Sequence, residues 1–372
     1  MTERIKLEEI YDKNINFLIG SGASVGLLPT LALRVKDEGG NTFTIETLST
    51  RLKDEEKLEV DTLLFMHYYK MCIEPAMEID FDNLGPAQQT VLDNYISFLR
   101  TVLYCMGRSQ SSTKNSNIFT TNYDGCIVHA ADRLIYQDKM NFVLNDGARG
   151  FRKRYLHARN FNSFTYETGI FNQHKTDIPQ INLINLHGSV YWKKQADRIQ
   201  IDYLASAEDM RINVIKDSPV DALSEIIDDD SKVYLDVVDL QADITEIEPF
   251  WDTYKKLPIV NPTKWKFYET VFEEQYYQML RLLSYELEKQ NTVLITFGFS
   301  FSDEHILHLV QRSLSNPTLQ LYVCCFNESE KNAMEARFSE YSNVVCIAFD
   351  EDLDFTKFNS EVFTPVGTSG AI

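Results

Sequence analysis

The sequence predicts an α/β protein built around a parallel β-sheet whose two faces are covered by helices. Short apolar runs, of which 15–19, 181–186 and 293–297 are the clearest, end abruptly in small, polar or glycine residues, as buried parallel strands do. Towards the C-terminus, strand and helix patterns alternate with short connections, and right-handed crossovers between such units build a parallel sheet. Of the 372 residues, 44% are apolar, which is ample for a packed core in two or three domains.

The first apolar run, 15–19, leads into residues 20–24, which read Gly-Ser-Gly-Ala-Ser. Gly20 and Gly22 allow the backbone to adopt positive φ and leave no side chain between main-chain N–H groups and a phosphate, while Ser21 and Ser24 add hydroxyl donors. A pattern this short is equally typical of a tight turn without a ligand. Whether an anion-binding turn or a plain turn follows the strand stays open at this point.

Two further strands end in polar residues. The run 117–121 breaks into Asn122-Tyr123-Asp124-Gly125, and the run 181–186 is followed directly by His187 and a glycine. Because the carboxyl ends of parallel strands share one edge of the sheet, where ligands bind in open α/β folds, these side chains are expected to line a cleft. His187 there suits a general base near neutral pH, or alternatively caps a neighbouring carbonyl.

The C-terminal part repeats the same unit. The strand 293–297 leads into Gly298-Phe299-Ser300, and Ser302 or Asp303 is expected to cap a helix over 304–314. A strand over 319–326 is followed by Asn327, which is placed to contact a ribose or an adenine. A helix over 330–341 and a strand over 344–349 complete the series.

Two regions interrupt the strand pattern. Residues 45–106 have apolar side chains at helical spacing, and 193–262 is rich in acidic residues and is followed by a long amphipathic helix over 263–290. The acidic region is interpreted as a solvated face, with a docking surface for a basic partner as the alternative. We therefore divide the chain into a nucleotide-binding domain (1–35, 115–192 and 290–352), a helical insert (36–114), an acidic insert with the long helix (193–289) and a C-terminal tail (353–372).

Composition excludes several classes of function. The six cysteines are scattered without a Cys-x-x-Cys pair, and His305 and His308, three residues apart, have no carboxylate or thiolate companion that completes a metal set. Neither zinc nor another metal is therefore expected, and the thiols are expected to be buried and reduced. The formal net charge of −19 opposes nucleic acid and anionic membranes, and no local basic patch stands out. The charged first residues and the lack of a long apolar run predict a soluble, cytoplasmic protein.

Four motifs together resemble the NAD-binding fold of the sirtuins, in the same order and at similar spacing. They are residues 20–24, 120–125, 186–188 and 298–300, and the resemblance extends from Ile15 to about Phe349. The segment 261–306 is similar to bacterial sirtuin-like antiphage proteins encoded beside a HerA-type hexameric ATPase. The fold class expected from this resemblance is α/β: a Rossmann-like parallel sheet of the sirtuin type, with a helical insert and an acidic insert and without a zinc module.

The resemblance implies that NAD is bound as the substrate. Its pyrophosphate would lie on the turn 20–24, Asn122 and His187 would face the nicotinamide ribose, and Asp124 would lie near the carboxamide. The later contacts to phosphate and ribose would come from Gly298, Ser300 and Asn327. The full set of implied NAD contacts is Gly20, Ser21, Gly22, Ala23, Ser24, Thr121, Asp124, Gly298, Ser300 and Asn327.

Two departures from the family pattern bear on the reaction. Sirtuin deacylases carry a four-cysteine zinc module and a Pro-Asp-Phe-Arg run, whereas this chain lacks the cysteines and reads Pro29-Thr30-Leu31-Ala32. We therefore expect water as the acceptor: an NAD hydrolase in which Asn122 orients ribose or water and His187 is the base. The resemblance implies an antiphage effector that depletes NAD, as a homo-oligomer with a HerA-type ATPase and without direct nucleic-acid binding. The alternatives are a protein that binds NAD or an ADP-ribose-type nucleotide without turnover and, third, a deacylase.

Overall fold

The computed structural model describes residues 4–30, 32–109, 114–168, 175–204, 211–212, 215, 217–240, 247–260 and 272–365. Its centre is a seven-stranded sheet in which every strand pairing is parallel. Across the sheet the strands are β15 (Val344–Ile347), β14 (Leu319–Cys324), β13 (Thr292–Phe297), β1 (Asn14–Ile19), β4 (Asn115–Thr120), β10 (Gln180–Asn185) and β5 (Val143–Asn145). The predicted α/β class with a parallel, Rossmann-like sheet is confirmed.

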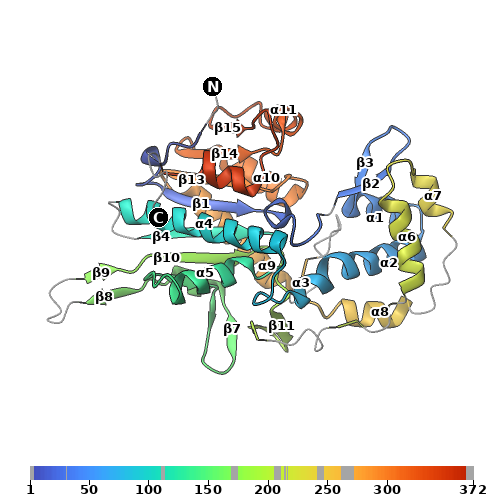
Figure 1. Ribbon diagram of the computed structural model, residues 1–372, viewed down its shortest axis with the longest axis horizontal. Helices are drawn as coiled ribbons and strands as arrows, with labels where there is room; N and C mark the ends of the chain where they lie inside the picture. The colour runs from blue at the N-terminus through green and yellow to red at the C-terminus, as the bar shows by residue number, and fades with distance from the viewer. Residues whose placement is uncertain are drawn as a thin grey trace.

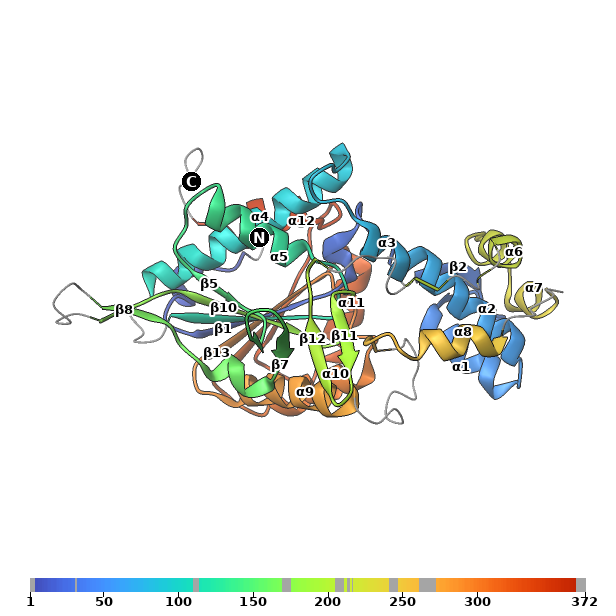
Figure 2. The same ribbon diagram turned by 90° about the horizontal axis from the view of Figure 1, so that it is seen from below.

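Helices cover both faces of this sheet (Figure 2). On one face lie α4 (Pro86–Arg108), α5 (Cys126–Tyr136) and the C-terminal α12 (Phe355–Lys357). On the other face lie α9 (Phe272–Glu288), α10 (Glu304–Ser313) and α11 (Glu328–Arg337). The adjacent Cys324 and Cys325 contribute to opposite faces, as alternation along a strand requires, and all six cysteines are buried free thiols.

The strand order determines where a ligand would bind. From β1 the chain moves outward through β4 to β10, and it then returns to β13 on the other side of β1 before moving outward again through β14 and β15. This is the order of a doubly wound sheet, with β5 added at one edge. In such sheets the crevice lies at the carboxyl ends of the strands where the winding direction reverses, which here are the ends of β1, β4 and β13.

A helical lobe lies to one side of the sheet (Figure 1). It combines two distant segments, which pack around one apolar cluster through contacts of α2 with α6 and α8. The first segment contains β2 (Ala32–Lys36), β3 (Thr42–Thr44), α1 (Ile45–Asp54), α2 (Leu58–Tyr68), a π-helical turn (Tyr69–Ile73) and α3 (Glu74–Glu78). The second contains α6 (Asp217–Ile227), α7 (Tyr234–Val238) and α8 (Ile247–Tyr254).

The packing thus groups the inserted segments differently from the sequence-based division. Helix α4 belongs to the predicted insert 36–114 but packs on the sheet and not with the lobe. Helix α9 was grouped with the acidic insert and also packs on the sheet. Of the long amphipathic helix predicted over 263–290, the part over 272–288 is observed, whereas 261–271 lies outside the described residues. Among the described residues, no helix has both the length and the apolar character that crossing a bilayer requires.

Besides the antiparallel pair of β2 and β3 in the lobe, two further small antiparallel sheets were not predicted. One contains, in spatial order, β11 (Trp192–Gln195), β12 (Arg198–Ile201), β7 (Arg154–Leu156) and β6 (Ala148–Arg149), and the other pairs β8 (Tyr166–Thr168) with β9 (Lys175–Asp177). These strands are two to four residues long, too short for alternation to be recognised in the sequence.

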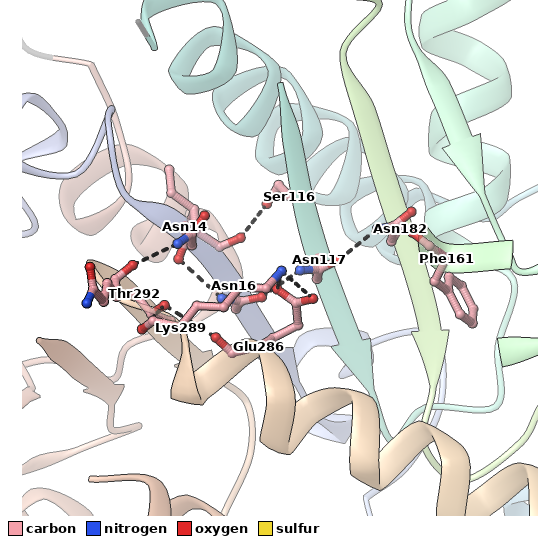
Figure 3. A network of polar contacts seen from close by, with 11 residues as sticks. Asn14, Asn16, Ser116, Asn117, Phe161, Asn182, Glu286, Lys289 and Thr292 are labelled. Atoms are coloured by element: carbon pink, nitrogen blue, oxygen red, sulfur yellow. Dashed lines mark hydrogen bonds and ion pairs between the residues drawn. The ribbon is translucent and has the colours of Figure 1, made fainter. Parts of the chain in front are cut away.

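A row of asparagines crosses the sheet on the face covered by α9 (Figure 3). Asn16, Asn117, Asn182 and Asn145 occupy paired positions on four neighbouring strands. Each side-chain amide donates to the side-chain oxygen of the previous residue, at 2.8 Å from Asn117 to Asn16, 2.8 Å from Asn182 to Asn117 and 2.9 Å from Asn145 to Asn182. Because a shift of one residue would break every bond of this chain, the row fixes the strand register.

We expect Asn117→Ala to lower the free energy of unfolding by about 2–4 kcal/mol, because it leaves a buried acceptor on Asn16 and a buried donor on Asn182 without their partner. Urea unfolding measures the change. Asn83→Ala is the control, since Asn83 bonds only at the surface, to Asp80. A loss in Asn117→Ala no larger than in this control would show that the row does not stabilise the fold.

Candidate functional site

The glycine turn after β1 packs against the loop after β13. Residues Ser21–Ser24 form a single 3-10 turn. Gly20 has φ −111° and Gly22 is not among the glycines with positive φ, so neither residue adopts the positive φ that glycine allows. A Cβ on Gly20 would lie 2.3 Å from the Gly298 carbonyl oxygen, and one on Gly22 would lie 2.6 Å from the Gly298 Cα. The glycines are needed because two backbones approach closely.

Gly298 completes this contact from the other side. It has φ +63°, its carbonyl accepts a hydrogen bond of 3.0 Å from the Gly22 N–H, and a Cβ added to it would lie 2.5 Å from the Ala23 nitrogen. Gly20 N–H in turn bonds to the Phe297 carbonyl. The turn over 20–24 and the loop after β13 therefore form one rigid rim at the reversal point of the sheet.

Asn122 lies at the same edge in a hydrogen-bonded cluster with Ser24, Tyr95 and Asp124. Its amide nitrogen is 3.2 Å from Ser24 Oγ and 3.3 Å from the Tyr95 hydroxyl. Ser24 donates to Asp124 at 2.7 Å, so in its 2.9 Å contact with Tyr95 the tyrosine hydroxyl is the donor. Burial, and then the nearby Asp124 carboxylate, raise the pKa of Tyr95 well above its usual value, which keeps that hydroxyl protonated.

This network fixes the orientation of the Asn122 side chain. With its NH2 group donating to Ser24 and Tyr95, its carbonyl oxygen faces away from the cluster and accepts no hydrogen bond from any described residue. Asn122 as a whole is only 8% exposed, so this unpaired acceptor is costly in the protein alone. A ligand that brings a hydroxyl or amide donor would satisfy it.

His187 is held by Asp303. His187 Nε2 lies 3.0 Å from Asp303 Oδ2, and both side chains are largely buried, at 13% and 6% exposure. The other oxygen of Asp303 accepts from the backbone N–H groups of His305 and Ile306, at 3.0 and 3.2 Å, and so caps α10 as predicted. Asp303 therefore has a second role that the sequence did not reveal, and its carboxylate already occupies the N-terminus of α10.

Asn122 and His187 follow two neighbouring strands, β4 and β10, at matching positions. Thr120 on β4 and Asn185 on β10 lie opposite each other. Asn122 comes two residues after Thr120, and His187 comes two residues after Asn185. The side chains are held on different sides of the edge: Asn122 bonds to Tyr95 of α4, whereas His187 bonds to the cap of α10, and these helices cover opposite faces (Figure 2). A ligand that touches both must therefore lie across the edge.

The other predicted residues have varied environments. Thr121 bonds through its backbone N–H to the Ile19 carbonyl, and Ala23 is buried in the core. Ser300 is exposed and contacts Ser302 through its hydroxyl, at 2.9 Å. Asn327 uses its side-chain oxygen to cap α11, accepting from Glu330 N–H at 3.0 Å, so this oxygen has a structural partner.

A hollow of about 420 Å³ opens beside the turn. It is lined by the segment that directly follows Ser24, namely Val25, Gly26, Leu27, Leu28, Pro29 and Thr30. The hollow lies next to the rim formed by the turn, and none of its lining residues is charged.

The helical lobe reaches the same edge through tyrosines. Tyr68 of α2 donates to the Tyr123 hydroxyl at 2.8 Å, and Tyr123 donates to the Val260 carbonyl at 2.9 Å. The backbone of Val260 also donates to the His187 carbonyl. Sequence reasoning missed Tyr68, Tyr95 and Tyr123 because tyrosines at helical spacing or after a strand are indistinguishable from core residues.

Among the described residues, no group of three or more His, Cys, Asp or Glu side chains is arranged to hold a metal ion. No family model matches this chain, and no curated protein is significantly similar to it.

Proposed function

We propose that the protein is an NAD glycohydrolase that converts NAD and water to nicotinamide and ADP-ribose. One observation carries the proposal most directly: the oriented, buried and unpaired carbonyl oxygen of Asn122 at the carboxyl edge of a doubly wound sheet. This acceptor fits a ribose hydroxyl or a water molecule, and its position fits a dinucleotide-binding crevice. The resemblance of four motifs in order to the sirtuin pattern supports NAD as the ligand.

His187 and Asp303 supply the base. In the neutral imidazole whose Nε2–H donates to Asp303, the lone pair is on Nδ1. The C1′–N glycosidic bond breaks with its electron pair going to nicotinamide, the water oxygen bonds to C1′, and the water proton passes to His187. Asn122 orients the ribose or the water, and Asp303 positions the imidazole.

The biological role proposed with this activity is bacterial antiphage defence by NAD depletion in the cytoplasm. Unrestrained NAD hydrolysis would damage the host cell, so activity would need restraint through assembly. A homo-oligomer associated with a HerA-type ATPase is the arrangement that the resemblance suggests, and the helical lobe beside the site offers a route for control through Tyr68 and Tyr123.

The test is incubation of the purified protein with NAD, alone and with the ATPase, with nicotinamide and ADP-ribose quantified by chromatography. We expect release of both products, and loss of release in Asn122→Ala. Asn83→Ala, in which a surface asparagine is removed, is expected to keep the wild-type rate. NAD binding without turnover in both conditions would instead show a nucleotide-binding module, and release only with an acylated peptide would show a deacylase.

A further inference from the structure

The four-stranded antiparallel sheet presents a basic surface in an otherwise acidic protein. Residues 147–166, which contain β6 and β7, include five arginine or lysine residues and no acidic residue, whereas the whole chain has a net charge of −19. No basic patch was expected from the sequence, because the residues contributed by 193–198 lie far from this segment in the chain.

The strand register shows which side chains share the outer face. Trp192, Ile199 and Ile201 face the core. One row of side chains therefore lies on the opposite, outer face. It runs across the strands from Arg149 to Tyr155, Gln200 and Lys193, and each residue is paired with the next. Arg198 lies over the Tyr155 ring, 5.6 Å from its centroid, and belongs to the same face. Figure 2 shows β7, β11 and β12 side by side.

The turn that joins β6 to β7 projects from this sheet and has a defined shape. Gly150 has φ +132°, and a Cβ there would lie 2.0 Å from the Lys153 carbonyl oxygen, so the turn requires glycine. At its base, Arg154 Nη2 lies 2.8 and 2.9 Å from the two oxygens of the buried Asp146. The hairpin is thereby anchored while its tip extends into solvent.

The tip carries Phe151 between cations. Phe151 is fully exposed, and Arg149, Arg152 and Lys153 beside it are also exposed. An exposed aromatic ring has no stabilising role in the protein alone, and arginines with planar guanidinium groups suit phosphate oxygens. Among described acidic residues next to the sheet, Asp197 lies 3.9 Å from Arg198, and Asp202 lies 4.0 Å from Lys193. The arginine and lysine side chains of this sheet and its hairpin outnumber these two carboxylates.

We propose that this surface, defined by Arg149, Phe151, Arg152, Lys153, Tyr155 and Arg198, binds single-stranded nucleic acid. The cations contact phosphates, and Phe151 stacks on an unpaired base, which is the combination that single-strand binding requires. An exposed aromatic ring among arginines favours this ligand over a duplex, whose bases are already stacked. Binding here is independent of the proposed NAD chemistry.

The experiment measures fluorescence anisotropy of a labelled 20-nucleotide oligonucleotide of mixed sequence, as DNA and as RNA, with the full-length protein and without NAD. With four phosphate contacts the affinity is expected to fall about 50-fold between about 50 and 200 mM salt, because each contact contributes a slope of about −0.7. The double variant Arg152→Glu/Lys153→Glu is expected to bind on the order of tenfold or more weakly at the lower salt concentration. Phe151→Ala is expected to lose roughly 5-fold or more.

The matched control is Lys255→Glu/Lys256→Glu, two exposed lysines after α8 in the helical lobe that give the same change in net charge. It is expected to keep most of the affinity, and thermal unfolding tests whether all variants are folded. No binding by the wild-type protein, or an equal loss in the control, would overturn the proposal. So would an unchanged affinity in Phe151→Ala. If the protein bound anionic vesicles through the hairpin but did not bind the oligonucleotide, the surface would be assigned to a membrane. If sedimentation showed an increase in mass without oligonucleotide binding, the surface would be assigned to a second copy of the chain.

Discussion

Gly298→Ala is expected to destabilise the protein by about 3–5 kcal/mol. Alanine at φ +63° costs about 1–2 kcal/mol on its own, and its Cβ would lie 2.5 Å from the Ala23 nitrogen and 2.8 Å from the Gly22 carbonyl carbon. Both neighbours belong to the backbone of the turn, which has no flexible side chain to yield. The variant therefore separates the ends of β1 and β13 at the rim of the site, and urea unfolding measures the loss.

Gly40→Ala is the matched control for this effect. Gly40 also has positive φ, at +84°, but a Cβ added there meets nothing within 4 Å. It is expected to cost only about 1 kcal/mol, from backbone conformation alone. Equal losses in the two variants would show that the close packing of Gly20, Gly22 and Gly298 does not matter for stability.

His187→Ala is expected to lower the rate of NAD hydrolysis by about 10²- to 10⁴-fold, because it removes the group that takes the proton from water. The rate of nicotinamide release under saturating NAD is the measurement. His308→Ala, which removes an exposed histidine on α10, is the control and is expected to leave the rate unchanged. Full activity without the His187 imidazole would exclude it as the base.

Asp303→Asn tests the positioning role of Asp303 separately from its structural role. Asparagine is a good N-cap and keeps an oxygen for the N–H groups of His305 and Ile306, so stability is expected to change little. Its NH2 group then faces His187 Nε2, which reverses the tautomer and places the proton on Nδ1. A fall in kcat with KM unchanged is expected, whereas Asp303→Ala lowers both kcat and stability by removing the cap.

Much of the edge could be predicted because each part of it is a local pattern. An apolar strand followed by small or polar residues precedes Gly20, Asn122 and His187. Parallel pairing of β1, β4 and β10 then brings the ends of these strands to one edge. A cap at Ser302 or Asp303 was also predicted, and Asp303 is the residue that caps α10, since capping depends on residues two and three positions away. These inferences need only the chain within a few residues.

The partners of these residues could not be predicted. Ser24 and Asp124 are 100 residues apart, and His187 and Asp303 are 116 residues apart. Tyr95 belongs to the apolar stripe of α4, and nothing in that stripe distinguishes a tyrosine whose hydroxyl orders a site from one that fills the core. The antiparallel sheet was missed for a related reason, because its basic face combines Arg149 with Arg198 from strands too short to recognise.

The amino-acid sequence alone predicted most strands of the parallel sheet and the polar residues that follow them, because these depend on side-chain periodicity and on short turns. Only the tertiary structure decided that the glycines serve backbone contact, that Asn122 presents an unpaired oxygen, that Asp303 faces His187 and that two distant inserts form one lobe. Such contacts depend on how remote segments pack, and packing satisfies hydrogen bonds and volume across the whole chain at once.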